Sequence, residues 1–305
     1  MNRIITTLIA FLFITNIFAQ ADDRPENTGD NFSLEGALAL FKKSGSLEEF
    51  EKMLNEENNN VNNLDLNNDG DIDYIVVNDI AEGDAHAIVL SVYLSEKEKQ
   101  DIATIGIEKV GTESAKLQIE GDADLYPENT IVEPKDDGDA FVPVQESTQS
   151  YSLRLKDDLS TNNFNGLIVH QADRSINTAE NLTVENHSSG QVFVNVWFWP
   201  GVRYVYAPGY MAWRSPWRWG LYPKWWRPWR PHGFGIFYGR SGPYRVHFHR
   251  VPTRRVIVAR GIYAPRRSRS TLVIHNNRRA TTIIKTNPRG RVKAVKVKRG
   301  RGRRF

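Results

Sequence analysis

A short acidic stretch between residues 65 and 73 has the side chains and the spacing that could bind a divalent cation. Asp65, Asn67 and Asp69 place an oxygen side chain at every second position, so these oxygens can converge on one hard cation. Gly70 permits the sharp turn that such a loop needs. The following positions offer a main-chain carbonyl and a further carboxylate. The sequence therefore predicts a structural Ca²⁺ site with the ligands Asp65, Asn67, Asp69, Asp71 and Asp73.

This stretch, D-x-N-x-D-G-x-x-D, resembles the calcium loops of EF-hands, dockerins, thrombospondin type 3 repeats and FG-GAP repeats. It departs from the EF-hand because its twelfth position is Val76 and not a bidentate glutamate, and because residues 74–77 are typical of a strand. The motif occurs once, which argues against a propeller or a dockerin. The alternative is an Asx-rich turn without a cation. Four carboxylates within nine residues repel one another, and this repulsion favours the cation.

A second candidate site is formed by alternating tryptophan and arginine in residues 213–219 and 225–230. Guanidinium planes can stack on indole faces, and either group can face a ligand. The predicted partner-binding residues are Trp213, Arg214, Trp217, Arg218, Trp225, Trp226, Arg227, Trp229 and Arg230. The alternative is that these aromatic side chains form a core, with the basic surface resting on the protein's own acidic domain.

Charge is divided sharply along the chain. All 36 Asp and Glu residues lie at or before Glu185, whereas residues 191–305 hold 27 of the 40 Lys and Arg residues. Opposite charges of this size attract within a chain or between chains. We therefore expect either an anionic component of the cell envelope or the acidic domain itself as partner, with self-association as a further option. Export argues against nucleic acid, although extracellular DNA stays open.

The N-terminus has the pattern of a secretory signal peptide. Arg3 is followed by the apolar residues 4–18 and by Ala19-Gln20-Ala21, a small-residue cleavage pattern. A membrane anchor is the alternative, but about 15 apolar residues are short for a transmembrane span. We therefore expect no transmembrane span after the signal peptide is cleaved. The absence of cysteine excludes disulfides and suits a bacterial periplasm or cell surface.

The spacing of apolar residues predicts the elements that carry these sites. Residues 33–55 have helical spacing in two short segments, with Ser46 and Glu49 placed to cap the second. Five apolar runs between residues 72 and 132 are typical of an antiparallel meander. The predicted fold class is therefore α+β, followed by a β or irregular Trp/Arg region, with β-like runs at 256–258, 271–274 and 282–284 and a disordered basic tail over the last 15 residues. We predict a signal peptide (1–21), an α+β domain (30–136), a linker or extension (137–190), a Trp/Arg-rich region (191–250) and basic segments with the tail (251–305).

The sequence contains no pattern that favours an enzyme. It has no G-x-S-x-G, no H-E-x-x-H and no phosphate-binding glycine loop, and residues 191–305 have no Asp or Glu for acid or base catalysis. The order of the segments resembles secreted Bacteroidota proteins of unassigned function, a resemblance that implies no activity. We therefore hold two hypotheses: a structural or interaction protein of the envelope, and a binding module for an anionic lipid, lipopolysaccharide, glycan or extracellular DNA.

Overall fold

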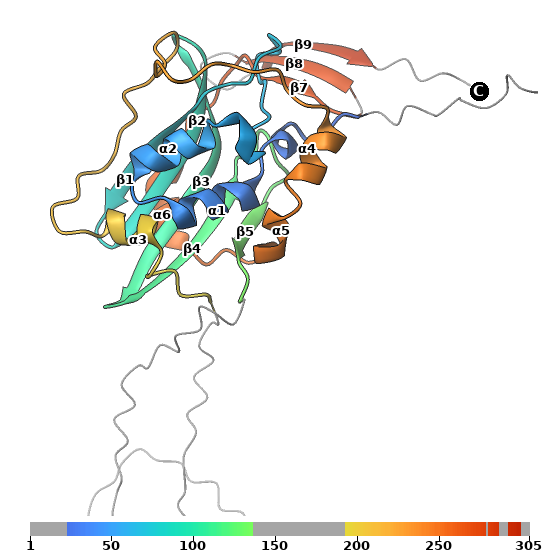
Figure 1. Ribbon diagram of the computed structural model, residues 1–305. Helices are drawn as coiled ribbons and strands as arrows, with labels where there is room; N and C mark the ends of the chain where they lie inside the picture. The colour runs from blue at the N-terminus through green and yellow to red at the C-terminus, as the bar shows by residue number, and fades with distance from the viewer. Residues whose placement is uncertain (1–22, 137–192, 279, 287–291, 300–305) are drawn as a thin grey trace, which may run out of the picture. The chain divides into compact units, whose positions relative to one another are not determined.

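The computed structural model describes residues 23–136, 193–278, 280–286 and 292–299 (Figure 1). The predicted signal peptide and the whole of the predicted linker lie outside these residues. By their contacts, the described residues 23–136 and those from Val194 onward fall into one unit. The acidic and the basic part of the chain therefore belong to the same structural unit.

Two helices form where the sequence predicts them. α1 (Leu34–Lys43) begins after Ser33, whose hydroxyl accepts a hydrogen bond from the Gly36 N–H at 3.0 Å. α2 (Leu47–Leu54) begins after Ser46, whose hydroxyl accepts from the Glu49 N–H at 3.1 Å. These bonds satisfy amides that a helix start would otherwise leave without a partner, so the chain ends one helix and restarts the next within three residues.

The predicted antiparallel meander is confirmed, and the fold is α+β. Strands β1 to β5 pair in chain order (Figure 1). A sixth strand from the basic half, β6, pairs with β5. Arg250 of β6 lies opposite Val132 of β5. The strands are β1 (Ile75–Glu82), β2 (Ala85–Ser95), β3 (Glu98–Gly111), β4 (Ser114–Gly121), β5 (Ile131–Pro134) and β6 (Phe248–Val251).

The sheet is covered on both faces. On one face α1 and α2 lie across the strands (Figure 1), and Val202 of α3 (Pro200–Val205) joins their core beside Phe41 and Phe50. On the other face α6 (Ile257–Tyr263) packs Ala259 onto Ala87 of β2. At Gly106 of β3 an added Cβ would come within 2.9 Å of Val256, so α6 can approach the sheet only over a glycine. Both halves of the chain thus build one core.

The basic half differs from its predicted structure in three respects. Residues 256–258, predicted as β-like, lie at the start of α6, and residues 292–299, predicted as disordered, form β9. β9 closes a second antiparallel sheet in the order β7-β8-β9. Short helices occur where the sequence predicts only strands or irregular structure. The remaining elements are η1 (Thr28–Asn31), η2 (Glu57–Asn59), α4 (Phe234–Arg240), α5 (Tyr244–His247), η3 (Ala264–Arg266), β7 (Ile274–Asn276), β8 (Ala280–Thr286) and β9 (Val292–Arg299).

Ion pairs join the basic residues 250–269 to the acidic sheet. Arg254 contacts Glu120 at 2.6 Å and Arg255 contacts Glu133 at 2.9 Å. Further pairs link Arg260 to Glu120, Arg266 to Glu82, Arg267 to Asp122 and Arg269 to Asp124. Within the described ranges, no helix is long and apolar enough to cross a membrane.

Candidate functional site

The acidic loop lies between η2 and β1, and its side chains fold back onto its own amides. Asp65 accepts hydrogen bonds from the N–H groups of Asp69 at 3.0 Å and Gly70 at 2.9 Å. Asn67 accepts from the same Asp69 N–H at 2.9 Å. Gly70 has a φ of +94°, a conformation that side-chain-bearing residues rarely adopt. The loop therefore brings together the side-chain oxygens at the first and third predicted ligand positions.

The other predicted ligands of the loop lie in different surroundings. Asp73 is buried and accepts from the Leu66 N–H at 2.6 Å, whereas Asp71 is exposed. Burial, followed by the charges of Asp65 and Asp69, raises the pKa of Asp73 well above its ordinary value. Burial also raises the pKa of Asp65. In the ranges that the structure describes, no Lys, Arg or His forms an ion pair with these carboxylates, and no group of three or more His, Cys, Asp or Glu residues is arranged to hold a metal ion.

Residues 211–231, which we name the aromatic segment, lie along the edge of β1. The Asp79 N–H donates to the Trp213 carbonyl at 2.8 Å, and the Ser215 N–H donates to the Val77 carbonyl at 3.1 Å. Farther along, the Trp229 carbonyl accepts from the Ile72 N–H at the end of the acidic loop. The segment therefore covers an edge strand that would otherwise expose unpaired backbone groups.

Side chains in the first part of the aromatic segment alternate between two sides. Trp213, Ser215 and Trp217 are half-buried, whereas Arg214, Pro216 and Arg218, which follow them in turn, are exposed. This alternation is what an extended chain with one covered side produces. The predicted tryptophan and arginine residues thus divide by side, with the indoles turned inward and the guanidinium groups outward.

The second part of the aromatic segment divides two neighbouring tryptophans. Trp226 is 7% exposed and packs on Tyr74, with ring centroids 5.1 Å apart, and on Val76. Trp225 is 47% exposed, and Trp229 is half-buried against the same cluster. Trp226 is therefore a core residue, and Trp225 stays available to a partner.

The basic residues of the aromatic segment differ in pairing from those of residues 250–269. Arg214, Arg218 and Arg230 are exposed and have no carboxylate within ion-pair distance among the residues that the structure describes. Lys224 is likewise exposed, with no carboxylate within ion-pair distance in the described residues. The Arg227 guanidinium donates hydrogen bonds only to the main-chain carbonyls of residues 224 and 226. The sequence cannot distinguish these two groups of arginine, because the carboxylates that pair with the second group lie more than 100 residues away.

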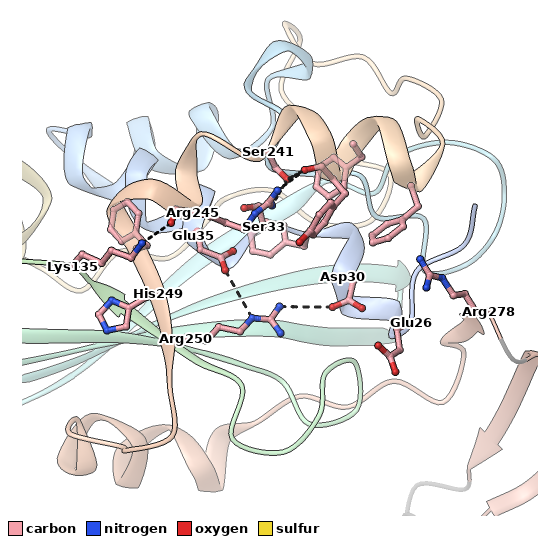
Figure 2. Close-up of a pocket in the computed structure, with 15 residues that line it drawn as sticks. Glu26, Asp30, Ser33, Glu35, Lys135, Ser241, Arg245, His249, Arg250 and Arg278 are labelled. Atoms are coloured by element: carbon pink, nitrogen blue, oxygen red, sulfur yellow. Dashed lines mark hydrogen bonds and ion pairs between the residues drawn. The ribbon is translucent and has the colours of Figure 1, made fainter. Parts of the chain in front are cut away.

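A cavity of about 710 Å³ opens beside η1, α4 and β6. Figure 2 shows the Arg250 guanidinium between two carboxylates, 4.0 Å from Asp30 and 3.9 Å from Glu35. Phe32, Phe237 and other aromatic side chains line the cavity. Sequence reasoning missed this cavity because its residues come from four separate parts of the chain and carry no local motif. Its mixed charges give no preference for an anion or a cation.

Two further features bear on chemistry. His86 lies 2.8 Å from Asp79, which also accepts from the Tyr210 hydroxyl at 2.9 Å, but both members of the pair are buried beneath aromatic rings. A second cavity, of about 290 Å³, lies between α2 and the aromatic segment.

Comparison with protein families, with curated proteins and with solved structures found no match.

Proposed function

We propose that this protein is a secreted, non-enzymatic interaction protein of the bacterial envelope, and that the outward side of its aromatic segment binds an anionic lipid surface. The observation that carries this proposal is the difference in pairing among the arginines. Those in residues 250–269 are neutralised by carboxylates of the sheet, whereas Arg214, Arg218 and Arg230 are exposed without a carboxylate in the described part of the chain. Guanidinium groups in this state can bind phosphate in a bidentate manner.

Exposed apolar side chains in the same segment favour a lipid surface over a soluble polyanion. Met211 is 85% exposed, and Trp219 and Leu221 are also exposed. Tryptophan and aliphatic side chains gain free energy where they enter the boundary between headgroups and acyl chains, while arginine stays with the phosphates. A glycan or DNA offers no comparable apolar region to Met211 and Leu221.

Sedimentation with lipid vesicles tests this proposal. Binding should increase with the fraction of phosphatidylglycerol in phosphatidylcholine vesicles and be weak without it. Neutralising three basic residues in Arg214→Gln/Arg218→Gln/Arg230→Gln should weaken binding on the order of a hundredfold, since each basic residue near an anionic surface contributes about 1 kcal/mol. The matched control is Arg260→Gln/Arg266→Gln/Arg269→Gln, which removes the same charge from exposed but carboxylate-paired positions. Equal losses in the two variants, or no binding by the wild type, would contradict the proposal.

A second proposal is that Ca²⁺ stabilises the acidic loop. It is supported by the convergence of Asp65 and Asn67 on one amide, and by the burial of Asp73 without a basic partner in the described ranges. The residues fit a weak site, because carboxylate and amide oxygens are the ligands that Ca²⁺ takes and the strong twelfth ligand is missing. Its role would be structural.

Calorimetric titration and thermal melting test the calcium proposal. We expect a Kd of about 10⁻⁴ to 10⁻³ M and a higher Tm with calcium. Asp69→Ala should abolish both effects, whereas Asp71→Ala should retain them because only the main-chain carbonyl of residue 71 is a predicted ligand. Absence of heat, together with a Tm that calcium does not change in the wild type, would exclude the site.

A further inference from the structure

The cavity between α2 and the aromatic segment combines aromatic walls with acidic side chains. Trp213, Trp217 and Trp225 line it from the aromatic segment. Glu48, Glu49 and Glu51 line it from α2. Indole faces carry negative electrostatic potential and attract cations, as carboxylates do. Its chemistry is thus opposite in sign to the outward side of the same segment.

Glu51 is the most unusual residue of this cavity because it is a buried carboxylate without a cationic partner. Its side chain accepts hydrogen bonds from the Tyr74 hydroxyl at 3.1 Å and the Ser215 hydroxyl at 2.8 Å. It also accepts from the Val77 N–H at 3.0 Å and, at the longer distance of 3.5 Å, from the Trp213 indole. All four donors are neutral, and no ion pair reaches Glu51 in the described residues. Its negative charge is solvated by dipoles and stays uncompensated.

An ammonium group of the chain itself already lies at the edge of this cavity. Lys52 places its Nζ 5.9 Å from the centre of the Trp225 ring. This distance is near the outer limit of a cation–π contact. The aromatic wall therefore attracts a cation, and the lysine leaves room on it for another one. Trp225 is exposed, and a ligand could therefore reach the cavity from solvent.

The hydrogen bonds of Glu51 select among cations. A carboxylate offers about four acceptor positions, and four donors already use those of Glu51. A primary ammonium would bring three N–H donors that this carboxylate can no longer accept. A quaternary ammonium has no N–H group, and it gains from charge and from contact of its methyl groups with indole faces. A metal ion is disfavoured because tryptophan supplies no ligand atom and the acidic side chains of the described residues include no group of three arranged to hold a metal.

We propose that this cavity binds a quaternary alkylammonium group, held by Trp213, Trp217 and Trp225 in the field of Glu51. The site is distinct from the proposed lipid-binding side, because it uses the indoles that line the cavity and not the outward arginines. Lys52 competes for the aromatic wall, so its removal opens the site.

The test is a titration of the full chain in solution, followed by tryptophan fluorescence and calorimetry, with choline as probe and 3,3-dimethyl-1-butanol as its uncharged isostere. Choline should bind at least about tenfold more tightly than the isostere. Trp225→Ala should weaken choline binding about tenfold, Glu51→Gln should remove the preference for choline, and Lys52→Gln should tighten binding. The wild-type comparison and Trp225→Ala decide the matter if Glu51→Gln fails to fold.

Two results would overturn this inference. One is equal affinity for choline and its isostere, or no binding of either. The other is tighter binding of methylammonium than of tetramethylammonium, which would show that N–H donors are required. No vesicle takes part in the titration, so its failure leaves the lipid proposal standing, and failure of vesicle binding leaves this site standing.

Discussion

Trp225 and Trp226 are neighbours in the chain, yet they have opposite roles. The N–H of Trp226 donates to the Pro223 carbonyl at 3.1 Å, and the turn directs one indole into the cluster with Tyr74 and Val76 and leaves the other exposed. Aromatic content alone therefore does not define a binding surface. The exposure and the contacts of each tryptophan distinguish the core residue from the one available to a partner.

Replacing each of these tryptophans by alanine should separate stability from binding. Trp226→Ala should lower the free energy of unfolding by about 3–5 kcal/mol, because it leaves a cavity in a packed cluster. Trp225→Ala should lower it by less than about 1 kcal/mol, because half of that indole is already in water. Urea unfolding followed by circular dichroism measures both. Similar losses for the two variants would show that Trp225 is also core.

Glu51 should give the protein a pH-dependent component of stability. Burial raises the pKa of its carboxyl above the ordinary 4.5. A carboxyl with a higher pKa in the folded chain holds its proton more tightly there, so this stabilisation is present at low pH and is lost as the pH rises through the folded pKa. The stability of the wild type relative to Glu51→Gln should therefore fall as the pH rises from about 4.5. A relative stability that stays constant or grows as the pH rises would contradict the shifted pKa.

At the scale of elements, α6 depends on a residue of the sheet. The Glu108 carboxylate of β3 accepts from the N–H groups of Val258 at 2.7 Å and Ala259 at 3.1 Å, while Val256 at the helix start has no capping side chain. Lys116 contacts the other oxygen of Glu108 at 2.9 Å. A carboxylate distant in sequence thus satisfies the first amides of the helix.

Glu108→Ala should loosen α6 specifically. We expect a loss of about 1–2 kcal/mol of stability, the range for a lost helix cap, and faster hydrogen exchange of the α6 amides. Lys116→Ala is the matched control, because it removes the ion pair and leaves the cap in place. Unchanged exchange in Glu108→Ala, or equal acceleration in Lys116→Ala, would show that the cap does not hold the helix.

The elements that the sequence predicts correctly are those whose signals are local. The serines before α1 and α2 and the period-two runs of β1 to β5 need only neighbouring residues. The prediction for residues 256–258 was wrong because Val256, Ile257 and Val258 favour a strand by propensity, whereas Glu108 and the close approach that Gly106 permits favour a helix there. The acidic loop is recognisable for the same local reason, but the cavities combine distant segments and have no sequence signal.

For the whole molecule, charge and apolar burial act together to hold the acidic and basic parts. The charge division alone predicts an association that salt weakens. However, Trp199, Val202 and Phe248 of the basic part lie in the same core as Phe41 and Leu38 of α1. Burial of such side chains is insensitive to screening.

Cutting the folded chain at a protease site inserted within residues 137–190 should therefore leave the two parts associated. Gel filtration should show co-elution even at about 1 M salt, where the Debye length is about 3 Å. Separation of the parts at that salt concentration would mean that ion pairs alone hold them. Separation at low salt as well would contradict the shared core.

The salt dependence of vesicle binding tests the central claim most directly, because it reports how many charged contacts form at the membrane. The affinity for phosphatidylglycerol vesicles should be measured from about 0.05 to 0.5 M salt for the wild type and the two triple arginine variants. We predict a steep fall for the wild type, a clearly shallower one for Arg214→Gln/Arg218→Gln/Arg230→Gln, and a wild-type slope for Arg260→Gln/Arg266→Gln/Arg269→Gln. The same slope for all three proteins would show that the outward arginines of the aromatic segment do not contact the lipid.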